Sequence, residues 1–157
     1  MCSMCPEWKA FPTSVPVTSS WSAKLPESYA RIGISRGQPR GQSGYKMYRA
    51  LAPGDWWNSV TPEEYSERYF AQLAKLDPAE VLAELASLAD GRIPALLCFE
   101  KPHDADAWCH RAFCSVWLKA TVGIDVFEYG LESFGAGLSH PKLPKASSLS
   151  KELKLAL

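Results

Sequence analysis

Apolar side chains recur at helical spacing in two adjacent segments of the chain. The first segment begins at Thr61-Pro62, with Glu64 three residues after the threonine, which is the signature of a capped helix start. The second begins in the same way at Asp77-Pro78 and ends at Asp90-Gly91, a typical helix stop. The two apolar stripes are Tyr65, Tyr69, Leu73 and Leu76, then Val81, Leu82, Leu85 and Leu88. Each segment is therefore predicted to be a helix with one buried face.

A third helix is predicted between two strands. Residues 93–99 form a nearly continuous apolar run, which is typical of a strand buried on both faces. Residues 105–121 have an apolar face at helical spacing, and residues 124–129 alternate between apolar and polar positions like a strand. This strand–helix–strand order predicts a crossover between parallel strands.

The remaining pattern completes an α/β fold. Two shorter strands are expected at residues 14–20 and 31–35, and glycines and prolines predict a long loop over residues 36–58. Together, these elements predict a three-layer sandwich with a mostly parallel sheet of about four or five strands and helices on both faces.

The size and composition of the chain fit one globular domain. Its 157 residues, of which 46% are hydrophobic and 22% charged, are enough to bury a core. We expect an irregular extension over residues 1–14, a single α/β domain over 15–134 and a loosely attached tail over 135–157. No apolar run approaches the roughly 18 residues of a membrane span, and the first ten residues lack the apolar core of a signal peptide. The protein is therefore expected in the cytoplasm.

Charge and cysteine content narrow the functional classes. Seventeen basic residues balance seventeen acidic ones, so binding to nucleic acid or to an anionic membrane would need a local patch. The five cysteines are an odd number without an export signal, which favours reduced thiols over a disulfide framework. Each cysteine is then a candidate core residue, metal ligand or nucleophile. Cys2 and Cys5 have the spacing of half a metal site, but no second pair follows downstream.

The densest cluster of reactive residue types lies on either side of the loop that follows the buried strand. Glu100 and Lys101 end the strand, and Cys109, His110 and Arg111 open the next helix. In open α/β sheets, ligands bind at the carboxyl ends of the strands, where helix N-termini direct free N–H groups toward them. We therefore expect Glu100, Cys109 and His110 to be catalytic, with Glu100 and His110 as bases and Cys109 as the nucleophile. Lys101 and Arg111 would bind an anionic group of the substrate.

Other roles for the cysteines stay open. Cys109 also falls on the apolar stripe of its helix with Phe113, where a buried thiol acts as a small hydrophobic residue, and Cys98 lies inside the apolar strand. A metal site made of Cys98, Cys109, His110 and Cys114 is a further alternative. Adjacent helical residues such as Cys109 and His110 diverge by about 100°, and the spacing is not that of a standard zinc module. We therefore expect no metal and no cofactor.

These motifs resemble those of a known family. The segments that carry the resemblance are Leu96-Leu97-Cys98-Phe99-Glu100-Lys101-Pro102, Cys109-His110-Arg111 and Trp117-Leu118, with Thr18-Ser19-Ser20, Ile32-Gly33-Ile34-Ser35, Tyr48-Arg49-Ala50-Leu51-Ala52-Pro53 and the Tyr65-to-Leu76 helix upstream. Over residues 15–130 the chain resembles the bacterial and phage family called domain of unknown function 488. The resemblance implies an α/β three-layer fold and a polar site around the glutamate and the Cys-His-Arg motif, without an established reaction. The cysteine-bearing N-terminal extension and the longer loop from His103 to Trp108 depart from the family pattern.

A second candidate feature is the glycine-rich loop after the second strand. Between Arg31 and Arg49 the chain has five cations, four glycines and no carboxylate. Glycine lets backbone N–H groups approach a phosphate, and arginine makes bidentate contacts to it. Arg36, Arg40 and Arg49 are therefore expected to bind substrate. The adjacent pair Trp56-Trp57 is a candidate for stacking on a base, although such a pair more often caps the edge of a core. The loop matches neither the Walker pattern nor the dinucleotide fingerprint, and a solvated flexible loop is the alternative.

These features lead to three functional hypotheses. The first is an enzyme acting on a nucleotide, nucleoside or nucleic-acid-linked substrate, with Glu100 and His110 transferring protons. The alternative is a non-catalytic phosphate or nucleic-acid binding module that uses the Arg31–Arg49 loop, and the third is a regulatory protein acting through partners. The expected partner is an anionic small molecule or a nucleic-acid phosphate rather than a membrane. Because a pure phosphate binder gains nothing from a carboxylate beside its ligand, Glu100 favours the enzyme.

Overall fold

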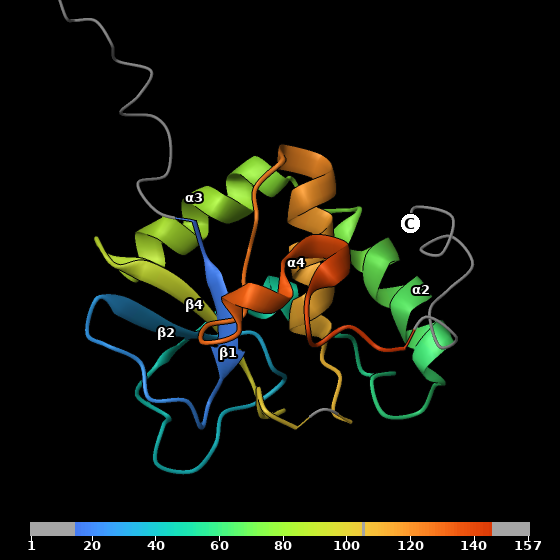
Figure 1. Cartoon of the computed structure of the whole chain (residues 1–157), viewed down its shortest axis with the longest axis horizontal. Helices are drawn as coiled ribbons and strands as arrows, with labels where there is room; N and C mark the ends of the chain where they lie inside the picture. The colour runs from blue at the N-terminus through green and yellow to red at the C-terminus, as the bar shows by residue number, and fades with distance from the viewer. Residues whose placement is uncertain (1–14, 105, 146–157) are drawn as a thin grey trace, which may run out of the picture.

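Four short strands form one sheet in which every strand runs parallel to its neighbours (Figure 1). The computed structural model describes residues 15–104 and 106–145. The strands are β1 (Val17–Ser20), β2 (Tyr29–Gly33), β3 (Lys46–Met47) and β4 (Ile93–Cys98), in the order β1-β4-β2-β3. In the register of the sheet, Leu96 lies beside Thr18 on one side and Ile32 on the other. The predicted α/β class with a mostly parallel sheet of four or five strands is confirmed.

Three helices pack on the sheet, and they are α2 (Pro62–Leu73), α3 (Pro78–Ala89) and α4 (His110–Val122). Both predicted helix caps are present. The Glu64 N–H donates to Thr61 Oγ1 at 3.1 Å, and the Ala79 N–H donates to Asp77 Oδ1 at 3.0 Å. The third helix begins at His110, later than the predicted residue 105.

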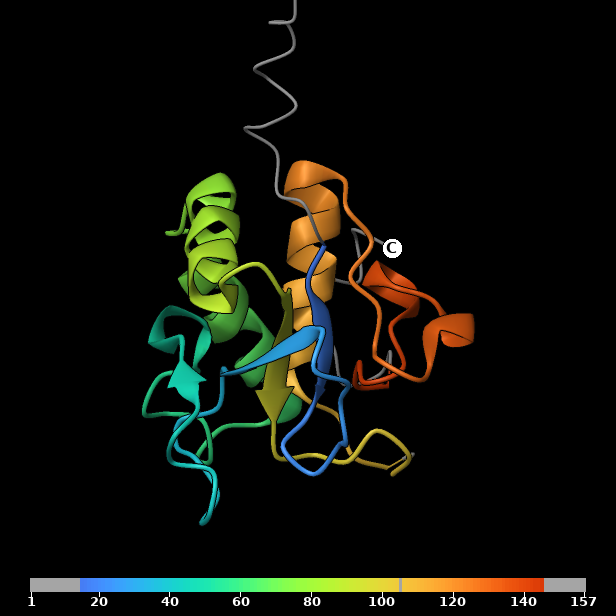
Figure 2. The same cartoon turned by 90° about the vertical axis from the view of Figure 1, so that its left-hand side faces the viewer.

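The helices cover one face of the sheet, and loops cover the other. Ile32 and Leu96, which are neighbours in the sheet, belong to a core that they share with Leu85 of α3 and Phe113 of α4. The opposite face holds a separate small cluster of Trp21, Ala95 and Leu97. Figure 2 shows β1 and β4 in front of α4. The predicted second helical layer is therefore absent from the described part of the chain, and the segment that follows β1 takes its place.

The segment after α4 lies beside β1 without forming a full strand. The Thr18 N–H donates to the Phe127 carbonyl at 2.9 Å and the Tyr129 N–H donates to the Thr18 carbonyl at 2.9 Å, so a single parallel bridge joins Thr18 to Glu128. Val126 is buried, and so is Glu128, although an alternation of apolar and polar residues does not predict burial of this carboxylate. The predicted strand at 124–129 is nevertheless wrong in extent, because backbone pairing with β1 is limited to this one position.

Residues 36–58 form the predicted long loop, which contains β3 and the short 3-10 helix η1 (Arg49–Leu51). Gly33, at the end of β2, lets the neighbouring segments approach closely. A Cβ atom at this position would lie 2.3 Å from the Trp21 ring and 2.4 Å from the Met47 sulfur. Any larger residue at position 33 would therefore push β3 or the Trp21 side chain away from the sheet.

Residues 135–145 pack against α4. The Gly137 N–H, in the 3-10 helix η3 (Gly137–Ser139), donates to Ser115 Oγ of α4 at 2.8 Å, and both His140 and Lys142 are buried. The 3-10 helix η2 (Glu132–Phe134) precedes this segment. The expectation of a loosely attached tail is corrected for residues 135–145, because buried polar contacts supply an attachment that apolar periodicity does not reveal.

Several sequence predictions concern residues outside the described part of the chain. These are the irregular extension over residues 1–14 with its Cys2–Cys5 pair, and the end of the tail over residues 146–157. Among the helices of residues 15–104 and 106–145, none combines the length and apolar character required to cross a membrane.

Candidate active site

A cavity of about 550 Å³ opens at the carboxyl ends of β2 and β4, beside the start of α4. Its wall comes from the residues after β2, the residues after β4, the segment that leads into α4, and the loop before α2 with the first turn of that helix. The lining residues are Ser35, Arg36, Gly37, Pro53, Trp57, Val60, Pro62, Tyr65, Cys98, Phe99, Glu100, Asp106, Ala107, Trp108, Cys109 and His110. The parallel pairing of β2 with β4 brings Arg36 and Glu100 to the same edge of the sheet, where open α/β sheets bind ligands.

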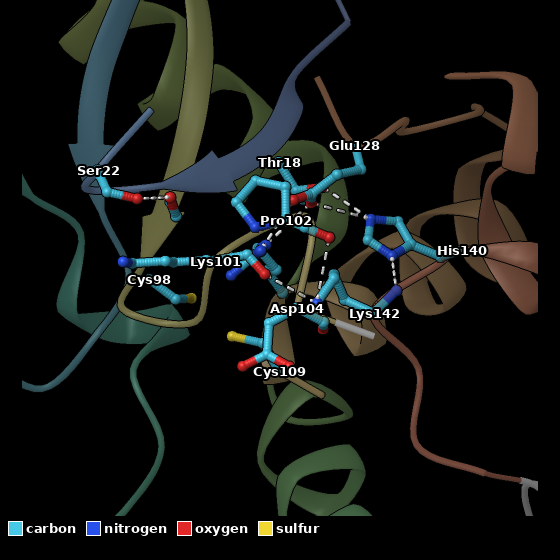
Figure 3. Close-up of polar contacts among 12 residues, drawn as sticks. Thr18, Ser22, Cys98, Lys101, Pro102, Asp104, Cys109, Glu128, His140 and Lys142 are labelled. Atoms are coloured by element: carbon cyan, nitrogen blue, oxygen red, sulfur yellow. Dashed lines mark hydrogen bonds and ion pairs between the residues drawn. The ribbon is translucent and has the colours of Figure 1, made fainter. Parts of the chain in front are cut away.

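Two cysteines and a histidine converge at the buried end of this cavity. Cys98 is the last residue of β4, Cys109 is the N-cap of α4, and His110 is the first residue of that helix. His110 Nδ1 lies 3.6 Å from Cys109 Sγ and 3.9 Å from Cys98 Sγ. Figure 3 shows the two sulfur atoms pointing toward each other.

The backbone of Cys109 explains why neighbouring residues can converge. Cys109 has an extended conformation (φ −149°, ψ 148°), so it stands just outside the helix rather than in its first turn as predicted. The expected divergence of about 100° between consecutive helical side chains therefore does not separate Cys109 from His110. Cys114, the other cysteine considered as a ligand, lies 3.2 Å from the Tyr69 hydroxyl instead. The three atoms of the cluster, on Cys98, Cys109 and His110, lie within 4.8 Å of one another.

His110 is oriented by a hydrogen bond to the segment that follows β2. Its Nε2 lies 2.7 Å from the Ile34 carbonyl oxygen, and because a carbonyl oxygen only accepts, Nε2 carries a proton. In the neutral ring Nδ1 is then the free nitrogen, and in the charged ring it donates toward Cys109. Tyr69 of α2 packs edge-on against the imidazole, with 5.3 Å between ring centroids. The ring orientation is thus set by the protein itself.

Burial and mutual attraction shift the pKa values of the groups in the cavity. Burial alone would raise the pKa of Cys109, but the hydrogen bond from Cys98 and the charges of His110 and Arg111 hold it well below its usual range. Burial and the hydrogen bond to Cys109 raise the pKa of Cys98 well above its usual range. Burial lowers the pKa of His110, but the charge of Cys109 outweighs this and raises it. Burial, followed by repulsion from Cys109, raises the pKa of Glu100 to about 7. The neighbouring charges thus favour the thiolate at Cys109, and burial favours the thiol at Cys98.

Arg111, predicted to bind an anion, does not line the cavity. Its Nε and Nη2 donate to the two carboxylate oxygens of Glu128 at 2.9 and 2.8 Å, and both side chains are fully buried. Glu128 Oε1 also accepts from Thr18 Oγ1 at 2.8 Å, and Thr18 Oγ1 lies 2.7 Å from His140 Nε2 (Figure 3). Arg111 therefore acts behind the cavity, where its charge favours the Cys109 thiolate.

Lys142 holds the loop between β4 and α4 in place. Its Nζ donates to the carbonyl oxygens of Lys101, Pro102 and Asp104 at 2.9, 3.4 and 2.7 Å (Figure 3). The Lys142 carbonyl in turn accepts from the Cys109 N–H at 3.0 Å. These contacts use the carbonyls of the loop and explain why α4 begins only after Cys109. Lys101, predicted to bind substrate, is exposed and is not among the lining residues.

The cations of the basic loop do not gather at one point. Arg36 lines the cavity, and its Nη1 donates to the Pro53 carbonyl at 3.0 Å. Arg31 instead donates to the Ala23 carbonyl at 2.8 Å. Arg40 and Arg49 are exposed and are not among the lining residues. Of the three loop arginines predicted to bind substrate, Arg36 is thus the one that the fold places at the cavity.

The aromatic part of the cavity wall was largely missed by the sequence analysis. Tyr65 has the periodicity of a core residue, and it is buried, but it also lines the cavity together with Trp108. Their rings make an edge contact with 4.9 Å between centroids and an angle of 89°. Trp57 and Phe99 lie at the cavity with 47% and 51% of their surface exposed. The Trp56-Trp57 pair was the available sequence signal, because helical periodicity assigns Tyr65 to the core.

Comparison with protein-family models, curated proteins and solved structures found no match for this chain.

Proposed function

We propose that this protein is an enzyme that acts on a nucleotide, nucleoside or nucleic-acid-linked substrate bound in the cavity. One observation carries the proposal: a single cavity combines an aromatic wall, an arginine and a set of ionisable side chains. Its volume of about 550 Å³ lies within the range of about 300–1,000 Å³ that is usual for small-molecule sites.

The wall supports recognition of a base with an attached anion. Trp57 and Phe99 are large apolar side chains that stay about half exposed at the cavity, which is typical of surfaces that meet a ligand. Stacking of a base on an aromatic ring contributes about 1–3 kcal/mol. Arg36 uses Nη1 for the Pro53 carbonyl, and since a guanidinium has five N–H donors, others remain for a phosphate.

The ionisable groups favour an enzyme over a binding module. Glu100 lines the cavity close to Cys109. Because a carboxylate repels a bound phosphate, a pure binding module would gain nothing from Glu100, whereas an enzyme can use it to transfer a proton. The alternative, a phosphate-binding or nucleic-acid-binding module, would use the cations between Arg31 and Arg49. These side chains contact different parts of the fold and do not meet at one site. The resemblance to the domain of unknown function 488 family adds an expected polar site around the same residues but no reaction.

Binding is tested by quenching of tryptophan fluorescence, since Trp57 and Trp108 line the cavity. The titrations use the four ribonucleosides and their 5′-monophosphates. We expect at least one base to bind, and its monophosphate to bind about tenfold more tightly through one charge-assisted contact of about 1.5 kcal/mol. Arg36→Gln should remove that difference, whereas Arg40→Gln, an exposed arginine of the same loop, should not. Absence of quenching by all eight compounds, or equal effects of the two variants, would contradict the proposal.

Turnover separates the enzyme from the binding module. The compounds that bind are incubated with the wild type and with Glu100→Gln, and products are identified by chromatography and mass spectrometry. Loss of a general acid or base costs about 10²–10⁴-fold in rate, so the variant should bind its ligand but form product at least about a hundredfold more slowly. Ligand binding by both proteins with product from neither would favour the non-catalytic module instead.

A further inference from the structure

We propose that Cys98, Cys109 and His110 bind a divalent transition metal ion, zinc by the chemistry of the donors, with its fourth coordination position open to the cavity. Their three donor atoms lie within 4.8 Å of one another, and thiolate sulfur and imidazole nitrogen are the ligands that zinc prefers. The proposal adds a cofactor to the site described above. Its catalytic part rests on the proposed function, whereas ion binding is measured without any substrate.

Two of the three separations between the donor atoms are close to those around a tetrahedral ion. With Zn–S distances of about 2.3 Å and Zn–N of about 2.0 Å, sulfur and nitrogen ligands stand about 3.5 Å apart. His110 Nδ1 lies 3.6 Å from Cys109 Sγ and 3.9 Å from Cys98 Sγ. Cys98 Sγ lies slightly nearer to Nε2 of the same ring, at 3.6 Å, so an ion bound through Nδ1 requires the Cys98 side chain to shift toward Nδ1.

The surrounding contacts fix the ligands as those of metal sites do. Metal-bound histidines donate their second ring N–H to a carbonyl or carboxylate, which fixes the tautomer that binds the ion. His110 Nε2 makes this contact with the Ile34 carbonyl at 2.7 Å, and Nδ1 is left for the ion. The Cys109 backbone is held by the Lys142 carbonyl at 3.0 Å, and Cys98 ends the central strand β4. The ligands are thus placed by the core rather than by a free loop.

The number of ligands indicates a catalytic ion rather than a structural one. Structural zinc sites have four protein ligands, whereas catalytic sites have three and leave one position for water or substrate. Within residues 15–104 and 106–145 the cluster has three members, and Cys114 contacts Tyr69 instead. All three ligands line the cavity, and so does Glu100, which is not a member of the cluster.

This arrangement supports hydrolysis. Some zinc enzymes remove amino groups from nucleobases. They activate water with a zinc ion held by two cysteines and a histidine, together with a glutamate that is not a ligand. The oxygen of the water would form a bond to an electrophilic carbon of the substrate, and the bond from that carbon to the leaving group would break. Glu100 would take the proton from the water and pass it to the leaving group. The reaction consumes one water and needs no oxidant or reductant.

The experiment measures metal binding by the full chain. Purified protein is loaded with zinc, dialysed and assayed by elemental mass spectrometry, and cobalt(II) is titrated in parallel. We expect one zinc per chain and, with cobalt, the thiolate charge-transfer and visible bands of a tetrahedral site. Loss of a hydrogen bond to a metal-bound side chain already costs about 10–100-fold in affinity, so Cys98→Ser, Cys109→Ser and His110→Gln should each weaken zinc binding by more than about a hundredfold.

Matched variants identify which cysteines hold the ion. Cys114→Ser, at a buried cysteine of α4, and the double variant Cys2→Ser/Cys5→Ser should keep the full affinity. Circular dichroism verifies that every variant folds. Zinc at a hundred times its dissociation constant should raise the melting temperature of the wild type by about 5–10 °C and leave that of Cys98→Ser unchanged.

Three results would overturn the proposal. These are zinc below about a tenth of an equivalent together with no cobalt bands, loss of zinc in Cys114→Ser equal to that in Cys98→Ser, and loss of zinc in the Cys2→Ser/Cys5→Ser variant. A protein that binds nucleotides but no zinc would refute this inference alone. A protein that binds zinc but neither binds nor converts any nucleoside or nucleotide would refute the proposed function alone.

Discussion

The buried histidine behind the site, His140, should make the protein lose stability in mild acid. Its Nδ1 accepts from the Lys142 backbone N–H at 3.0 Å, so Nε2 carries the proton that donates to Thr18 Oγ1 at 2.7 Å. A second proton on Nδ1 would face the Lys142 N–H. Burial lowers the pKa of His140 to about 4. Glu128 opposes this shift from 3.6 Å, but its carboxylate is already paired with Arg111.

The size of the effect follows from proton linkage. In the unfolded chain a histidine has a pKa near 6.5. Each unit of difference between the pKa values in the folded and unfolded states changes the free energy of unfolding by up to about 1.4 kcal/mol. Because the folded state binds the proton less well, the contribution of His140 is complete above about pH 6.5 and falls as the pH decreases. By about pH 4 the free energy of unfolding should have lost about 3 kcal/mol from this one group.

Urea denaturation measures this loss. Unfolding is monitored by circular dichroism at a series of pH values from 7 to 4, with a chelator present. His140→Gln removes the titration, so the variant should be less stable than the wild type at pH 7 and the difference should shrink by about 3 kcal/mol toward pH 4. His103→Gln, at an exposed histidine, should follow the wild type at every pH. A difference between wild type and His140→Gln that stays constant across the range would refute the reasoning.

Three further substitutions test the core and the network behind the cavity. Glu128→Gln leaves the buried charge of Arg111 without its counter-charge and should lower the free energy of unfolding by about 3–5 kcal/mol in guanidinium denaturation; a loss below 1 kcal/mol would contradict a buried ion pair. Leu85→Ala, at a fully buried position of α3, should cost about 2–5 kcal/mol and clearly more than Leu88→Ala at a half-buried position of the same helix. Burial raises the pKa of the Cys114 thiol to about 12, so a thiol reagent at pH 8 should label the folded wild type and Cys114→Ser at the same rate, and faster labelling of the wild type would show that Cys114 is accessible.

Local signals in the sequence predicted the elements whose starts they encode. Thr61 and Asp77 cap α2 and α3 because the capping interaction involves only the next three residues. The start of α4 was misplaced because it depends on Lys142, which binds the carbonyls of a loop about forty residues earlier in the chain. The 124–129 strand failed for a similar reason, since its burial is shared with α4 while its backbone meets β1 only around Thr18.

The position of the candidate site was more predictable than its composition. Parallel strands bring their carboxyl ends to one edge, so Arg36 and Glu100 had to lie near each other once β2 and β4 were paired. Side-chain partners were less predictable, because Cys98 and Tyr65 have the periodicity of core residues and are buried, yet they also line the cavity. An apolar pattern reports burial, and it does not distinguish burial under a helix from burial beneath a ligand site.

The three consecutive residues Cys109, His110 and Arg111 have different partners, which a motif alone does not show. Consecutive side chains within a helix diverge by about 100°, which separates His110 from Arg111, whereas Cys109 lies just outside the helix. Cys109 lies at the cavity with Cys98, His110 also bonds to the Ile34 carbonyl beyond β2, and Arg111 pairs with Glu128 beside β1. One helix start thus joins the ends of β4 and β2 to the segment beside β1. The motif is therefore explained as a structural junction that also carries two of the proposed metal ligands, and a displaced helix start would disrupt all three attachments together.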